Sequence, residues 1–151
     1  MITLNRGSQK KQTRDEDYLV INVHHNELGD TTEFHLPGTH LATRVEYLET
    51  HGWLVVQVIR CDRERYINER INQTVREYTY EDTLIELSRQ RFKRGEIDVT
   101  TYMETVRLAM DYKMTCLKIL YDQMRRLRRY DYDCTNEVAI QLCDQVFGPI
   151  F

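Results

Sequence analysis

The fold is decided by one stretch of the sequence, residues 99–129, which reads VTTYMETVRLAMDYKMTCLKILYDQMRRLRR. Its apolar residues recur at alternating steps of three and four, which is the spacing of one face of an α-helix. Lys113 is the one charged position in that series. The spacing therefore predicts a single amphipathic helix over residues 99–129.

A helix of this length needs a partner of matching length. At 1.5 Å per residue it would be about 45 Å long, more than the width of a compact domain of this size. Gly95 can end a preceding helix and Asp98 can cap the next one, so residues 93–98 predict the corner of a helical hairpin. The partner is then the stretch 62–94, as one helix or two, and a second copy of the chain is the alternative.

The corner reads RFKRGEID over residues 91–98 and is followed by Tyr102, Leu117 and Tyr121-Asp122. Over residues 82–129 this pattern resembles the helical hairpin of the TolC-like outer-membrane efflux family. The resemblance implies the hairpin geometry alone. The channel function of that family would imply an export signal, barrel strands and an internal repeat, which this sequence does not show.

Residues 18–61 predict a small sheet with one helix. The segments 18–23 and 31–36 are rich in β-branched and aromatic residues and flank a turn-like cluster, which favours a β-hairpin. Thr39 is placed to cap a helix that Gly52 ends. Residues 53–59 are apolar on both faces apart from Gln57, which predicts a buried third strand.

We therefore expect an α+β fold with a small N-terminal antiparallel sheet, a long antiparallel helical hairpin and a short C-terminal helix. The last helix is predicted from about Thr135 to Phe147, with Val138, Leu142 and Val146 on one face. The expected organisation is a flexible basic arm over residues 1–16 and a single domain over 17–151. Within that domain we expect the sheet part over 17–61, the hairpin over 62–130 and the last helix over 131–151.

Composition sets outer limits on the class of protein. The 151 residues are 41% hydrophobic and 30% charged, with a net charge of -3, as in an ordinary globular protein. The longest apolar run falls far short of the roughly 20 residues that span a bilayer. The first residues lack the apolar stretch of a secretory signal. We therefore expect no membrane partner and a cytoplasmic location.

The sequence shows no catalytic or metal-binding signature. All five histidines lie between His24 and His51, and with Cys61 they could in principle assemble a zinc site, but none of their spacings matches a zinc motif. Four cysteines lack any Cys-x-x-Cys pair, which is typical of buried thiols. No nucleophile elbow or phosphate loop is present. We expect no cofactor, no metal and no enzymatic activity.

The long helix carries the strongest candidate for an interaction surface. Methionine and tyrosine favour interfaces, although the same stripe is also suited to the hairpin seam. We expect a protein–protein interaction or assembly protein that binds a protein partner or a second copy of itself. The candidate surface consists of Tyr102, Met103, Val106, Met110, Leu117, Leu120, Met124 and Leu127.

The alternative function is a nucleic-acid-binding regulator. Arg125, Arg126, Arg128 and Arg129 form the densest positive cluster, as phosphate contacts require. Cations also gather at a helix C-terminus because the macrodipole favours them there. Asp131 and Asp133 are close enough in sequence to pair with these arginines. Because the chain is also net negative, nucleic acid is the less favoured partner.

Overall fold

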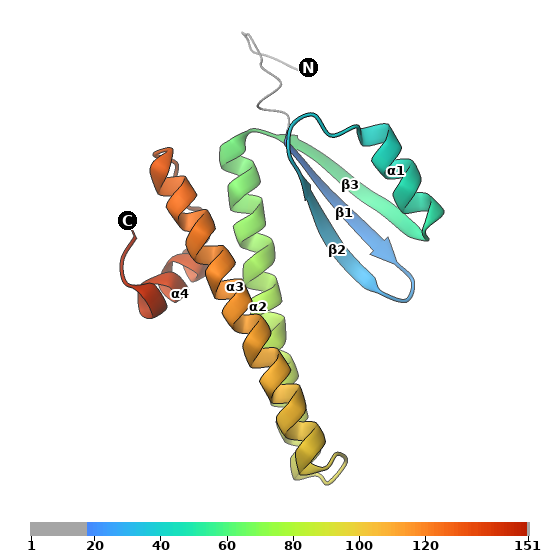
Figure 1. The fold of residues 1–151 in the computed structure, drawn as a ribbon, viewed down its shortest axis with the longest axis vertical. Helices are drawn as coiled ribbons and strands as arrows, with labels where there is room; N and C mark the ends of the chain where they lie inside the picture. Colours follow the sequence, from blue (N-terminus) through green and yellow to red (C-terminus); the bar gives the residue numbers. More distant parts are fainter. Residues whose placement is uncertain (1–17, 151) are drawn as a thin grey trace. The chain divides into compact units, whose positions relative to one another are not determined.

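The computed structural model describes residues 18–150, and its contacts divide into two compact units, one ending at Glu69 and one beginning at Arg70. The expected α+β class is confirmed, because a three-stranded antiparallel sheet precedes two long helices that pack together and a short C-terminal helix (Figure 1). The basic arm expected over residues 1–16 lies outside the described residues. A single domain over 17–151 stays a prediction.

The first unit is built around its central strand. The sheet has the order β2-β1-β3, with β1 spanning Tyr18–His25, β2 Gly29–His35 and β3 Trp53–Cys61. Both neighbours run antiparallel to β1, so that Ile21 lies opposite Glu33 on one side and Val58 on the other.

Strand β1 is covered on both faces. Leu19, Ile21 and Val23 pack with Leu48 of helix α1 (Leu41–Thr50), which connects β2 to β3. The opposite face carries Tyr18, whose ring lies 4.6 Å from that of Tyr66. Continuous burial of these β-branched and aromatic side chains makes β1 the core of the unit.

The predicted third strand over residues 53–59 is present as part of β3, but the prediction that it is buried is wrong. Strand β3 lies at an edge of the sheet, and Leu54 and Val56 are exposed, Val56 at 63%. The physical reason is the crossover through α1, which returns the chain to the free side of β1 and leaves β1 in the centre. A register irregularity beside Asn22 also leaves Val56 without a partner in β1.

The helix cap assigned to Thr39 is also wrong. Helix α1 begins after His40, which makes no side-chain cap hydrogen bond. The Thr39 hydroxyl instead donates to the Leu36 carbonyl at 2.8 Å, and so closes the turn that follows β2.

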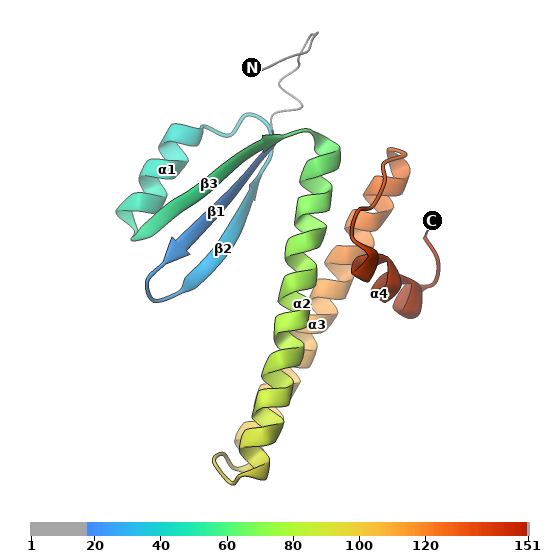
Figure 2. The same ribbon diagram turned by 180° about the vertical axis from the view of Figure 1, so that it is seen from behind.

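Helix α2 (Arg63–Lys93) is one continuous helix, which resolves the alternative left open by the sequence. Its residues up to Glu69 belong to the first unit and the remainder to the second. Helix α3 (Val99–Arg129) runs beside it in the opposite direction (Figures 1 and 2). The predicted hairpin is thus present.

The corner of the hairpin forms as its residue types dictate. Gly95 adopts a left-handed φ of 75°, and the Glu96 N–H reaches back to the Arg91 carbonyl at 2.9 Å, which closes α2 with a Schellman motif. Asp98 then caps α3 by accepting a hydrogen bond from the Thr101 N–H at 2.7 Å.

Helix α4 (Glu137–Phe147) packs against α3 (Figure 2). The Phe147 ring lies 4.6 Å from that of Tyr121. Its cap is Asn136, whose side chain accepts from the Ala139 N–H and donates to Asn72. The buried residues are Ala139 and Cys143, whereas Val138 and Val146 of the predicted apolar face are exposed. Small side chains at the contact allow two helix backbones to approach closely. This explains why α4 turns Ala139 and Cys143 toward its neighbour and leaves the larger valines in solvent.

Candidate interaction surface and arginine pocket

The hairpin consists of a well-packed base and a poorly packed tip. We call residues 70–75 and 116–129 the base segment, and residues 76–115 the tip segment. Most large side chains buried in α3 belong to the base, and Leu120 and Leu127 have no exposed surface. Within the tip segment Ala109 alone is buried. The base segment is therefore stabilised by buried apolar side chains, whereas the tip segment buries almost none.

Large apolar side chains are nevertheless present in the tip segment. Nine of them are exposed to solvent, Met103 most of all at 63%. Met103, Met110 and Met114 are spaced by seven and four residues, which places them on one face of α3. Exposed apolar side chains gathered on one helix face, as these three methionines are, mark interaction sites. The nine residues are Tyr80, Leu87, Phe92, Val99, Met103, Leu108, Met110, Tyr112 and Met114.

The structure divides the candidate surface predicted from the sequence. Leu117, Leu120, Met124 and Leu127 are buried and form part of the core. The other four members lie in the tip segment.

Of these four, Met103 and Met110 are exposed, and Val106 is half-buried. Tyr102 stacks on Phe92, with ring centroids 4.9 Å apart. The candidate surface predicted from the sequence did not include Met114, because the three-four series falls on Lys113, one residue earlier. The spacing of four residues between Met110 and Met114 would have indicated that the two share a face.

Polar contacts hold the two helices of the tip segment together. The Tyr112 hydroxyl donates to the Glu77 carboxylate at 2.7 Å, and this hydrogen bond raises the pKa of Tyr112. Lys113 donates to Asp82 and lies 4.7 Å from the centre of the Tyr78 ring. Burial alone would lower the pKa of Lys113, but these partners outweigh it and raise the pKa. Lys113, the one charged residue in the apolar series, thus forms a contact between the two helices.

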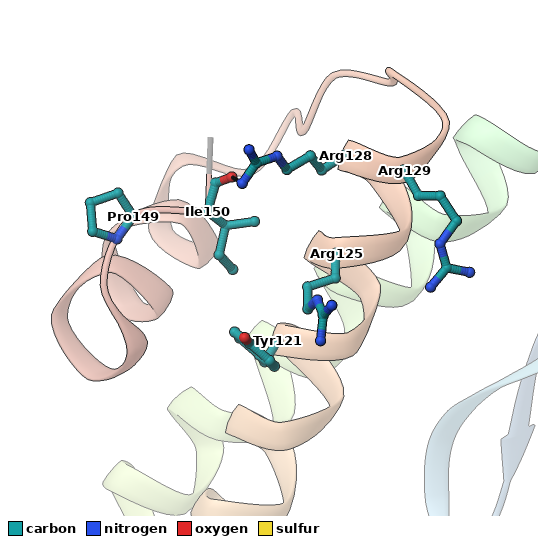
Figure 3. Close-up of a pocket in the computed structure, with 6 residues that line it drawn as sticks. All are labelled: Tyr121, Arg125, Arg128, Arg129, Pro149 and Ile150. Carbon is teal, nitrogen blue, oxygen red and sulfur yellow. Dashed lines mark hydrogen bonds between the residues drawn. The ribbon is translucent and has the colours of Figure 1, made fainter.

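The arginine cluster borders a pocket of about 390 Å³ at the C-terminal end of α3 (Figure 3). Tyr121, Arg125 and Arg128 lie on successive turns of the helix, while Pro149 and Ile150 supply the facing wall. Arg128 donates to the Ile150 carbonyl, and Arg125 lies 5.7 Å from the centre of the Tyr121 ring. Arg129 also lines the pocket, whereas Arg126 donates to Gln123.

These arginines have no acidic partners within residues 18–150. None of Arg125, Arg126, Arg128 and Arg129 forms an ion pair with a carboxylate there, so the pairing with Asp131 or Asp133 that the sequence allows is not found. Asp131 instead occupies the left-handed position that ends α3, with φ 60°.

The helix dipole gives a weak account of this cluster. A favourable helix C-terminus is worth only about 0.3–1 kcal/mol per exposed cation. At the end of α3, backbone N–H groups already satisfy three of the last four carbonyls, including that of Leu127 by Tyr132 at 2.8 Å. Within the described part of the chain these arginines therefore carry positive charge that no carboxylate neutralises.

The histidines do not converge on a site. His24 contacts Asp30 at 2.6 Å, His35 contacts Glu33 at 2.8 Å, and His51 contacts the Tyr47 carbonyl, each in its own local turn or strand. Across residues 18–150 no three histidine, cysteine, aspartate or glutamate side chains are grouped so as to hold a metal ion.

One local ion pair of unit 1 was not foreseen. Glu33 of β2 accepts hydrogen bonds from Arg44 of α1, at 2.9 Å from Nε, and this contact lowers the pKa of the carboxyl although partial burial opposes it. The pair ties the helix to the edge of the sheet.

The cysteines are free thiols with suppressed reactivity. Cys61, Cys116 and Cys143 are buried, and removal from water raises the pKa of each to about 11. Half-buried Cys134 has a raised pKa for the same reason. Because the thiolate is the nucleophile, these residues are poorly suited to catalysis.

Comparisons with protein-family models, with curated proteins and with solved structures found no match to this chain. Between residues 18 and 150, none of the helices combines the length and the apolar character needed to cross a bilayer.

Proposed function

We propose that this protein is a non-enzymatic interaction or assembly protein that binds a protein partner through the hairpin tip segment. One observation carries the proposal: residues 76–115 expose nine large apolar side chains and bury only Ala109. Helices in water derive most of their stability from packing of an apolar face. A partner that covers the tip segment would supply the packing that the hairpin lacks.

The methionine stripe is the centre of the proposed surface. Met103, Met110 and Met114 present flexible, polarisable side chains along α3, a composition that suits adaptable protein interfaces. Charged groups beside the stripe are already paired within the helix, as Arg107 is with Glu104 at 2.8 Å. The stripe is therefore an apolar surface whose neighbouring charges are already paired. Such a surface favours binding of an apolar helix over binding of a charged ligand.

Self-association is the version to test first. Light scattering coupled to size-exclusion chromatography measures the mass of the particle over a range of concentrations. We expect a species larger than the monomer, which Met103→Glu with Met110→Glu reduces to the monomer because two charges cannot enter an apolar interface at low cost. Thr101→Glu with Thr115→Glu is the matched control, since it adds the same charge on another face of α3.

A wild-type chain that stays monomeric at high concentration would remove the self-association version. A photo-crosslinking residue at position 103, compared with one at 101, then tests for a different protein partner in native cells. A discrete adduct from position 103 alone is expected. Equal labelling from both positions, or none from 103, would contradict the proposal.

Nucleic-acid binding through Arg125, Arg126, Arg128 and Arg129 is the second candidate function. The absence of carboxylate partners for these side chains within residues 18–150 favours it. Fluorescence anisotropy with DNA and RNA tests it, because replacing the four arginines should abolish binding and flatten its dependence on salt. Three of the four, Arg125, Arg128 and Arg129, line a pocket of about 390 Å³, which favours a compact ligand over a strand.

A further inference from the structure

We propose that the pocket between the last turns of α3 and Pro149-Ile150 binds a small phosphorylated molecule. The ligand class is a phosphate or diphosphate group attached to a ring of roughly nucleotide or sugar size. This inference is independent of protein binding at the hairpin tip, because it concerns residues of the opposite end of α3.

The charge of the pocket calls for an anion. Three of its six lining residues are arginines, and none of the six is acidic. Within residues 18–150 no carboxylate pairs with Arg125, Arg128 or Arg129. Elsewhere in the same unit exposed arginines do find acids, as Arg89 does with Glu86 at 2.6 Å. Like charges gathered without counter-charges repel one another, and a bound phosphate would relieve that repulsion.

Two of the arginines are held in place before any ligand arrives. Arg128 donates one N–H to the Ile150 carbonyl, which leaves other donors of the guanidinium free. Arg125 lies over the Tyr121 ring, and that ring is itself packed against Phe147. Figure 3 shows both arginines on the side of the helix that carries Tyr121. Guanidinium groups fixed in this way can bind phosphate oxygens in pairs with little loss of entropy.

The walls of the pocket define the rest of the ligand. Tyr121 offers a phenol ring and Pro149 an exposed aliphatic ring beside the guanidinium groups, while Ile150 is buried. A volume of about 390 Å³ falls within the range of small-molecule sites. Inorganic phosphate alone would leave the Tyr121 and Pro149 rings uncovered, so a ring attached to the phosphate fits the pocket better.

Isothermal titration calorimetry of the full chain with pyrophosphate, with ADP and with a short single-stranded RNA tests the proposal. We expect pyrophosphate to bind and ADP to bind more tightly, because its ring adds contact with the apolar wall. Arg125→Gln with Arg128→Gln should weaken both by about tenfold or more, as loss of paired charge-assisted hydrogen bonds requires. Arg89→Gln with Arg107→Gln is the control that removes the same charge from ion-paired, exposed positions.

Arg128 also fastens Ile150, so its replacement could loosen the wall. Arg125→Gln alone leaves that hydrogen bond intact and should still weaken binding, with an unchanged thermal midpoint. Three results would overturn the proposal: no heat with either small ligand, an equal loss in the control variant, or binding of the RNA alone. The last result would assign the arginines to nucleic acid, and its affinity would fall steeply with salt.

Discussion

The two halves of α3 follow one sequence pattern and differ in what covers it. Residues 116–129 bury Leu117, Leu120, Met124 and Leu127, with α2 and α4 packed around them. Residues 99–115 continue the same helical spacing but leave Met103 and Met110 in solvent. Periodicity thus identifies an apolar face reliably, but it does not say whether the same chain or another molecule covers that face.

The largest expected effect concerns leucines in these two halves. Leu120→Ala should lower the free energy of unfolding by about 2–5 kcal/mol, because a fully buried leucine leaves a cavity. Leu108→Ala, at a side chain that is 55% exposed, should cost less than about 0.5 kcal/mol. Urea denaturation followed by circular dichroism measures both. Similar costs for the two variants would show that the tip is as well packed as the base.

A smaller effect is expected from the caps that end the two long helices. Gly95 after α2 and Asp131 after α3 both have left-handed backbones, at φ 75° and 60°. Gly95→Ala should destabilise by about 1 kcal/mol, since a Cβ there meets no neighbour within 4 Å and the cost is purely conformational. Asp131→Gly should stabilise by a similar amount, about 0.5–1 kcal/mol.

Thermal unfolding and denaturant titration give both numbers, and Asp131→Asn is the control, because asparagine tolerates the same backbone region. A gain in stability from Gly95→Ala would contradict the assignment of this corner as a left-handed cap.

The smallest expected effect is a change with pH at the start of α3. The hydrogen bond from the Thr101 N–H lowers the pKa of Asp98 below its ordinary value of 3.8. The cap therefore contributes its full stabilisation above pH 3.8. This stabilisation is lost as the pH falls through the lower pKa that Asp98 has in the folded state. The Thr101 amide proton shift, followed by NMR between about pH 5 and pH 2, should report this loss.

Asp98→Asn is the matched control, because asparagine caps a helix equally well and does not titrate. A pH profile for this variant identical to the wild-type profile would place the titrating group elsewhere.

Local signals in the sequence predicted the helical part of the fold well. Gly95 and Asp98 specify a stop and a start through backbone preferences that act within a few residues. Both were identified correctly, and so was the hairpin they connect. The apolar series over residues 99–129 also predicted the length of α3 correctly, because helical spacing is a local property of the sequence.

Features that depend on tertiary position were harder to predict. The segment 53–59 has the composition of a central strand, yet chain topology gives that position to β1. In α4 the sequence interpretation chose Val138 over Ala139, because hydrophobicity does not show which face a neighbouring helix will approach. The lack of a carboxylate partner for Arg125 and Arg128 within residues 18–150 was equally hidden, since Asp131 is near in sequence but ends α3 in a left-handed conformation.

The suppressed thiols make the molecule convenient for spectroscopy. With a pKa of about 11, each of Cys61, Cys116 and Cys143 is a thiolate in only about one molecule in ten thousand at pH 7. A cysteine introduced at an exposed position such as Gln90 would react with maleimide far faster than these native residues. Once the half-buried Cys134 is replaced by serine, a dye or spin label could then report on the hairpin tip.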